Sequence, residues 1–323
     1  MNPWEVTQGP QSKQSEWARQ QGYLFSTAEW GHVLEGLGCR VLFAWNKQLA
    51  AGVVVPIFMR GPFKVAFLGF PIAGEAFDLL EPDAFEQLEA ELVEVMRCSL
   101  VRGVRSRICE LKGQVVTALP EVWIDDLKVW FGQRSKRLVK DLAFAARAVA
   151  NLTIVSQAGD AMTSHSLYEQ TIRGHGGKVR YTQEYFQRLK ALCERDGLVK
   201  GVSCLNARDR TVGFAYAARH GGVVYYLHGA VDAEVRSQGV GDLLLHRLVE
   251  WAHQTNARSF SLMASPKDQP GLLQYKKKWG DRVGYTTTHD VGYGAVGRSF
   301  VWLSAKANEF LGERCARKKQ KNK

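Results

Sequence analysis

The chain has 323 residues, 46% of them hydrophobic and 23% charged, a balance that excludes a disordered chain and, at this length, favours two domains. Lys and Arg outnumber Asp and Glu by 43 to 32, a formal net charge of +11, and six of the cations stand in the last ten residues. The six cysteines form no CxxC pair and have no histidine at metal spacing, so we expect neither a metal site nor a disulfide framework.

The start of the chain does not read as a targeting segment. Its first thirty residues carry charged and amide side chains and no continuous apolar run, unlike a secretory signal. Elsewhere no uncharged apolar run approaches the roughly 20 residues that a membrane-spanning helix needs. We therefore expect a cytoplasmic protein with no transmembrane segment, and we set residues 1–20 apart as an N-terminal segment.

Residues 21–130 are expected to form a first α+β lobe. Apolar residues at helical spacing predict a helix over 23–38 that stops at Gly38, and Asp83 opens a second helix with Glu86 as its capping partner. Runs of β-branched and aromatic residues predict the strands of the lobe. These expected strands are 40–45, 49–59, 65–70, 107–111 and 122–125.

A basic amphipathic helix over 131–150 is expected to link this lobe to a second one over 151–310. The second lobe repeats the order of elements of the first, although no repeat is visible at the level of residues. Its expected helices are 162–173, 182–195 and 240–254. Its expected strands are 152–156, 198–206, 211–219, 223–230 and 259–263, with further strands up to residue 305.

Residues 311–323 form a basic tail. Tails of like charge usually stay solvated and disordered, and this is our expectation. The alternative is attraction to phosphate on a nucleotide, on a nucleic acid or on an anionic membrane face, with which the tail would make peripheral contact.

The stretch from 223 to 254 predicts an anion-binding turn between a strand and a helix. Its loop has the sequence Arg236-Ser237-Gln238-Gly239-Val240-Gly241. A helix N-terminus binds anions because its first amides lack partners and the helix dipole is positive there. The two glycines would let the backbone approach a pyrophosphate, and the arginine adds a charge. The alternative is a plain glycine-bearing turn.

Arg236, Gly239 and Gly241 match the pyrophosphate-binding signature of GNAT acyltransferases, which the chain resembles here. The segment Tyr275-Lys276-Lys277-Lys278-Trp279-Gly280 is similar to the corresponding segment of FemAB-like proteins and of related acyltransferases from exopolysaccharide clusters. The resemblance covers roughly residues 20–305. It implies an α+β fold of two tandem GNAT-like lobes, each a mixed, mostly antiparallel sheet flanked by helices.

Acyl transfer to an amine needs a held donor, a deprotonated nucleophile and a stabilised oxyanion. Since an alkyl amine with a pKa of about 10.4 is mostly protonated at neutral pH, a base is needed, and His228 is our candidate because its strand ends beside the loop. The alternative is a hydrogen-bonded core histidine.

The resemblance assigns Lys276 to the phosphate or the oxyanion. The alternative is a solvated turn of three lysines, at least one of which cannot face the site. Tyr275 is a candidate proton donor to the leaving group, although it stands one residue before the tyrosine position of GNAT enzymes.

We therefore expect an N-acyltransferase that moves an acyl group from acyl-CoA to an amine by direct attack. The resemblance implies an amino sugar or a cell-envelope or polysaccharide precursor as acceptor, either a small molecule or a nucleotide-sugar or lipid-linked compound.

Two alternatives stay open. One is aminoacyl transfer from charged tRNA to a peptidoglycan precursor, in which Arg134, Lys136, Arg137, Lys140 and the tail would follow tRNA phosphates. The other is a non-catalytic, nucleotide-binding module derived from the GNAT fold.

Overall fold

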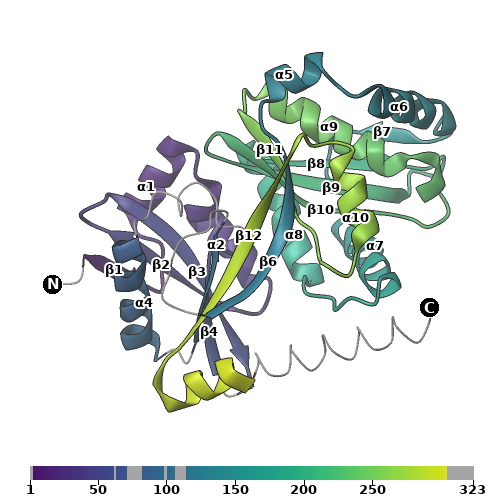
Figure 1. Ribbon diagram of the computed structural model, residues 1–323. Coiled ribbons are helices and arrows are strands. Elements are labelled where there is room, and N and C mark those ends of the chain that lie inside the picture. Colours follow the sequence, from purple (N-terminus) through teal and green to yellow (C-terminus); the bar gives the residue numbers. More distant parts are fainter. Residues whose placement is uncertain (1–2, 62, 71–81, 98–99, 106–113, 304–323) are drawn as a thin grey trace.

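The computed structural model describes residues 3–61, 63–70, 82–97, 100–105 and 114–303 (Figure 1). In this part of the chain twelve strands form a single mixed, mostly antiparallel sheet with helices on both faces, so the predicted α+β class is confirmed. Each helix there is too short or too polar to span a bilayer.

The strands are β1 (Trp4–Thr7), β2 (Arg40–Asn46), β3 (Ala51–Arg60), β4 (Phe63–Leu68), β5 (Leu100–Arg105), β6 (Gln114–Ile124), β7 (Thr153–Val155), β8 (Val199–Leu205), β9 (Thr211–His220), β10 (Val223–Val231), β11 (Ser259–Ala264) and β12 (Arg282–Gly292). The helices are α1 (Ser12–Gln21), α2 (Ala28–Glu35), α4 (Pro82–Met96), α5 (Leu127–Gly132), α6 (Lys136–Ala148), α7 (Ala161–Gly174), α8 (Gln183–Asp196), α9 (Val240–Gln254) and α10 (Pro270–Lys277), with short 3₁₀ turns η1 (Leu24–Ser26) and η2 (Arg236–Gln238).

The sheet consists of two copies of one strand pattern. β1 to β5 pair in chain order, three times antiparallel and then parallel between β4 and β5, and β7 to β11 repeat this pattern with the parallel pair between β10 and β11. A parallel pair needs a crossover connection, which α4 supplies in the first half and α9 in the second. The order of elements that repeats in the sequence therefore corresponds to the same arrangement of strands and crossover helix in both halves.

The two halves exchange strands where they meet. β6 leaves the first half to pair with β11, and β12 returns from the end of the second half to lie between β5 and β6. Figure 1 shows these two long strands running side by side through the centre of the molecule. Neither half completes its sheet without the other.

Three apolar clusters hold the elements on the sheet. α4 buries Phe85, Leu88 and Leu92 against the first half, and α9 buries an apolar stripe against the second. A third cluster joins the halves, because α2 packs Trp30 into the same core as Tyr185 of α8. The halves are therefore tied by apolar packing as well as by strands.

Several expected elements need correction. The segment set apart as residues 1–20 contains β1 and α1, and β1 is the edge strand of the sheet. The single helix expected over 131–150 is two, since Ser135 Oγ accepts a hydrogen bond from Leu138 N at 3.2 Å and so begins α6. The strands expected up to residue 305 end at Gly292, and residues 294–303 are helical.

The strand expected at 107–111 and the basic tail at 311–323 lie outside the described residues. The domain boundaries at 130, 150 and 310 stay predictions.

Candidate active site

The parallel strands β10 and β11 separate at their carboxyl ends. They pair from Val223 to Tyr225 against Ser259 to Ser261, and each then shifts register against its other neighbour, β10 between Tyr226 and His228. On β11, Met263 takes a left-handed φ of 63° within that shift. Beyond this point β10 and β11 no longer pair with each other, and they separate at the edge of the sheet where α/β proteins commonly bind a ligand.

The predicted donor loop follows β10, and part of it is already hydrogen-bonded. In η2, Gln238 N donates to Val235 O at 3.1 Å and Gly239 N to Arg236 O at 3.3 Å, so we correct the expectation that these two amides face a diphosphate. Val240 and Gly241 open α9, and their N–H groups have no hydrogen-bond partner within the described ranges. The predicted anion site of the loop is therefore reduced to two open amides at the positive end of the helix.

The side chains of the loop divide into exposed and packed ones. Arg236 and Ser237 are exposed, and the Arg236 guanidinium donates to Val231 O at 3.3 Å, which holds it over the loop. Gln238 is half-buried, and Val240 is fully buried beneath α9.

The two glycines of the loop are there for different reasons. Gly239 has a φ of +80°, and a Cβ on it would come within 2.7 Å of Ala145 Cβ on α6, so the fold itself requires glycine. A Cβ on Gly241 would meet only Val231 at 3.8 Å and the Tyr275 hydroxyl at 3.9 Å. Because the protein leaves room at Gly241, that glycine is the one that a ligand would need.

Tyr275 stands beside the open amides. Burial, and after it the Asp242 carboxylate, raise the pKa of Tyr275 well above its usual value, so the phenol keeps its proton at neutral pH and is a weaker acid than an exposed tyrosine. Lys278 Nζ lies 5.1 Å from the centre of the tyrosine ring and is held by Asp242 at 2.8 Å and Asp141 at 3.2 Å.

Lys276 is buried, whereas Lys277 is exposed. Lys276 Nζ donates to Met263 O at 2.9 Å and to Ala264 O at 3.0 Å, and thereby fixes the unpaired end of β11. Burial lowers its pKa to about 8, against the opposing effect of the Glu121 carboxylate. The alternative of a solvated turn thus holds for Lys277 but not for Lys276.

A comparison with protein families identifies this region. Residues 133–277 match the model described as an acetyltransferase (GNAT) domain. The chain carries a GNAT acetyltransferase domain. It includes the donor loop, the unpaired strand ends, Tyr275 and Lys276, and the predicted acyltransferase class is confirmed.

Solved structures extend the likeness from the GNAT domain to the whole fold. FemX has a TM-score of 0.62 at 10% identity, with 89% of this chain and 97% of FemX covered. L-PGS from Bacillus licheniformis has a TM-score of 0.56 at 11% identity and 95% and 98% coverage. N-myristoyltransferase from Saccharomyces cerevisiae with bound myristoyl-CoA has a TM-score of 0.52 at 12% identity, covering 91% and 80%. The predicted FemAB-like fold is confirmed. No curated protein sequence matches the chain.

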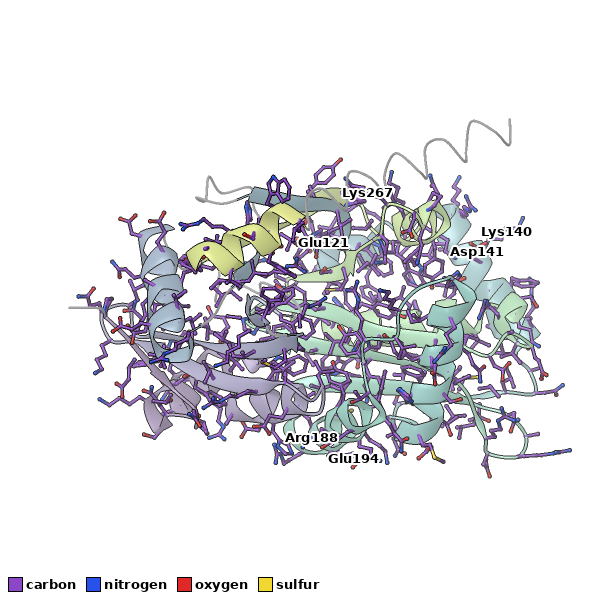
Figure 2. All side chains as sticks on the ribbon, turned by 90° about the horizontal axis from the view of Figure 1, so that it is seen from below. Glu121, Lys140, Asp141, Arg188, Glu194 and Lys267 are labelled. Atoms are coloured by element: carbon purple, nitrogen blue, oxygen red, sulfur yellow. The ribbon has the colours of Figure 1, made fainter. Side chains whose placement is uncertain are left out.

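Glu121 is a candidate site residue that sequence reasoning missed. It lies on β6, in the middle of the molecule (Figure 2), and its buried carboxylate accepts hydrogen bonds from the Ser261 and Thr286 hydroxyls. Burial raises its pKa, opposed by these two hydrogen bonds and by Lys276. The first half of the chain thus contributes a carboxylate to the GNAT domain. No local sequence motif around Glu121 predicts this role.

His228 lies on the other face of the sheet. Its buried ring packs among aromatic side chains of α7 and α8, and Nε2 lies 3.0 Å from Tyr185 Oη. Tyr275, by contrast, packs on the opposite face, against the apolar core beneath α9. Burial lowers the pKa of His228 to about 3, so the imidazole is neutral but a weak proton acceptor. These are the properties of the hydrogen-bonded core histidine, and the role of His228 as a base stays a prediction.

Replacing His228 with Gln should reduce the stability lost in acid. Because the folded pKa is about 3 and the ordinary value is 6.5, the unfolded chain binds the proton within this window, and stability falls as the pH falls through it. Gln cannot titrate, and His220, whose pKa is also about 3, contributes equally to both proteins. Urea unfolding at neutral pH and at about pH 4.5 measures the difference, and equal losses would contradict a neutral buried imidazole.

Proposed function

We propose that the chain transfers an acyl group from acyl-CoA to an amine by direct attack within a ternary complex. The observation that carries this proposal is the pair of open amides at Val240 and Gly241, beside the Tyr275 hydroxyl. Lys276 of the same helix as Tyr275 is fixed on the end of β11. The likeness to N-myristoyltransferase with bound myristoyl-CoA supports acyl-CoA as donor.

In this proposal the two amides and Arg236 hold the donor diphosphate. The amine nitrogen attacks the thioester carbon, and the Lys276 ammonium, which uses two of its three N–H groups on carbonyls of β11, offers the third to the oxyanion. The carbon–sulfur bond then breaks, and Tyr275 gives its proton to the departing thiolate. The attacking nitrogen loses a proton as it becomes the amide, and this proton restores the Tyr275 phenol by way of solvent. His228 is a structural residue in this scheme.

For the acceptor, we propose an amino sugar or another amine of a cell-envelope or polysaccharide precursor, handled in the cytoplasm. The likeness to FemX supports the envelope assignment. Transfer assays with acetyl-CoA and longer acyl-CoAs against amino sugars, nucleotide amino sugars and lipid-linked amines, read by release of free thiol, test both substrates at once.

Aminoacyl-tRNA is the second candidate donor. Helix α6 packs on the donor loop through Ala145, and its exposed Lys136, Arg137 and Lys140 could follow a longer polyanion. Titration calorimetry separates the candidates. Binding of CoA and acyl-CoA supports our proposal, whereas salt-sensitive tRNA binding without a response to CoA would replace it. CoA binding without turnover on any amine would favour the non-catalytic module.

A further inference from the structure

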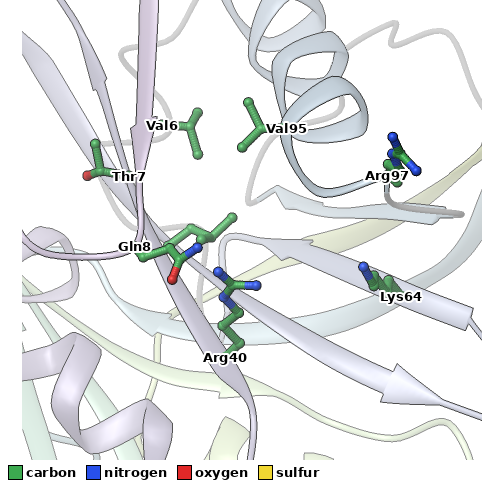
Figure 3. Close-up of a pocket in the computed structure, with 8 residues that line it drawn as sticks. Val6, Thr7, Gln8, Arg40, Lys64, Val95 and Arg97 are labelled. Carbon is green, nitrogen blue, oxygen red and sulfur yellow. The ribbon is translucent and has the colours of Figure 1, made fainter.

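The GNAT domain contains a buried cation. Lys276, 5% exposed, is the only buried Lys or Arg among the side chains that the structure describes. Other cations lie in water, as Arg40 and Arg97 do at the pocket of about 430 Å³ in the first half that Figure 3 shows. Water screens those charges, whereas a buried ammonium tends to lose its proton unless an opposite charge lies near it. The two hydrogen bonds of Lys276 end on neutral carbonyls, so the opposite charge has to come from another group.

Glu121 supplies that charge. It is 3% exposed, and it is the register partner of Ala264, whose carbonyl accepts a hydrogen bond from Lys276 Nζ. Burial lowers the pKa of Lys276, and the negative charge of Glu121 opposes this effect. A buried acid on β6 and a buried ammonium on α10 thus meet at the end of β11.

The other charged groups around Glu121 and Lys276 have partners of their own or face solvent. They are Lys278, which pairs with Asp242 of α9 and Asp141 of α6; Arg282 of β12, which pairs with Asp125; and Lys277, which is exposed. The balance of charge at the end of β11 therefore depends mainly on one acid and one lysine.

Two hydroxyls from neighbouring strands fix the Glu121 carboxylate. Ser261 on β11 donates to Oε1, and Thr286 on β12 donates to Oε2, an arrangement that suits an ionised carboxylate because it only accepts hydrogen bonds. Ser261 Oγ also accepts a hydrogen bond from Met263 N at 3.0 Å, while Met263 O accepts one from Lys276. The acid and the ammonium thus hold the two backbone groups of Met263, the residue of left-handed φ at which β11 shifts register.

We propose that Glu121 is a positioning residue for acyl transfer: its carboxylate keeps Lys276 as an ammonium and, through Ser261, holds the strand end on which that ammonium is fixed. This role rests on the proposed function, in which the ammonium donates to the oxyanion. A neutral amine in the same place would stabilise the developing negative charge far less, because it carries no charge of its own. In this way a strand of the first half sets the protonation state of a residue in the GNAT domain.

A double-mutant cycle of Glu121→Gln and Lys276→Met tests the pair without any substrate. Glutamine keeps the shape of the acid and removes its charge. In the wild type the folded pKa of Lys276 is about 8, below the ordinary 10.5, so the stability relative to Lys276→Met rises with pH between these values. Without the acid the folded pKa falls further, and in the Glu121→Gln background the rise should begin about one pH unit lower. Urea unfolding of the four proteins from about pH 6 to pH 10 measures both onsets.

The pH dependence of turnover tests the role in catalysis. Because the ammonium is the active form, turnover at saturating substrates should fall as the pH rises past about 8, and in Glu121→Gln this fall should begin about one pH unit lower. CoA affinity should stay within about twofold of the wild type, since the diphosphate is proposed to bind the amides of α9.

Two further variants separate the charge of Glu121 from its packing. Glu121→Asp keeps the charge but draws it back by one methylene group, so both onsets should move in the same direction by less than in Glu121→Gln. Glu194→Gln removes an exposed carboxylate of α8 at the edge of the molecule (Figure 2), where water screens it. It is the matched control and should behave as the wild type in both measurements.

The two measurements fail in different ways. An unchanged onset in the stability cycle, in Glu121→Gln or, should that variant not fold, in Glu121→Asp, would show that the carboxylate does not act on the ammonium and would overturn the inference. A shifted stability onset with an unmoved turnover profile would show that the pair exists without a part in the reaction, which overturns the role of Glu121. A wild type that binds CoA but transfers to no amine would refute the proposed function and this role with it, whereas the stability cycle would still report the pair.

Discussion

Gly241→Ala should weaken CoA binding by about tenfold or more and leave the fold as stable as before. The protein has room for this methyl group, and alanine is better than glycine within a helix by roughly 0.5–1 kcal/mol, so the melting temperature should stay the same or rise slightly. The methyl group would, however, stand between the amides of Val240 and Gly241 and a diphosphate. Titration calorimetry with CoA and a thermal melt measure the two effects separately.

Gly239→Ala is the contrasting variant from the same loop. Its positive φ and the contact with Ala145 make alanine strained there, at a cost of about 1–3 kcal/mol, so a loss of CoA binding would report damage to the fold. Full CoA affinity in Gly241→Ala at unchanged stability would show that the donor diphosphate does not lie against these amides. That result would remove the observation on which the proposed function depends.

Local sequence signals predicted the elements that surround the donor loop. The helix expected over 240–254 is α9 with the same bounds, because the glycines of the loop mark its start and one apolar stripe runs along its length. The strands expected at 40–45 and 49–59, and at 198–206 and 211–219, are also present, since they are continuous apolar runs separated by polar turns, and each pair forms an antiparallel hairpin. Signals of this kind depend only on neighbours within a few residues.

The long-range features had no such signal. The exchange of β6 and β12 brings together residues that are far apart in the chain. Glu121 and Thr286, for example, are separated by 165 positions. Glu121 reads in the sequence as one acid before an apolar strand, and its partners become visible only when β6, β11 and β12 lie together. The surroundings of His228 had no local signal for a related reason, because the tyrosine that it contacts is on a helix that the strand pattern does not place.

Lys276→Met should lower the turnover number by about 10² to 10³ while CoA affinity stays close to that of the wild type. The ammonium is hydrogen-bonded to carbonyls at the end of β11, whereas we propose that the diphosphate binds the two amides of α9, so loss of the ammonium should affect the oxyanion and not donor binding. Methionine keeps an unbranched apolar stem in place of the lysine and removes the charged nitrogen. Lys277→Met, a change at the exposed neighbour, is the matched control and should behave as the wild type. Normal turnover in Lys276→Met would exclude the lysine from the reaction.

The pH dependence of stability tests the burial of Lys276 without any substrate. Its folded pKa of about 8 lies below the ordinary value of 10.5, so between these values the unfolded chain holds the proton more tightly and the folded state gains stability as the pH rises. Below about pH 8 both states are protonated, and the folded protein bears the full desolvation cost of the ammonium. The stability of the wild type relative to Lys276→Met should therefore rise between about pH 8 and pH 10, measured by urea unfolding, because methionine has no charge to lose. A constant difference across this range would mean that the amine is solvated, and a solvated amine could not hold the unpaired end of β11 in the position that the reaction requires.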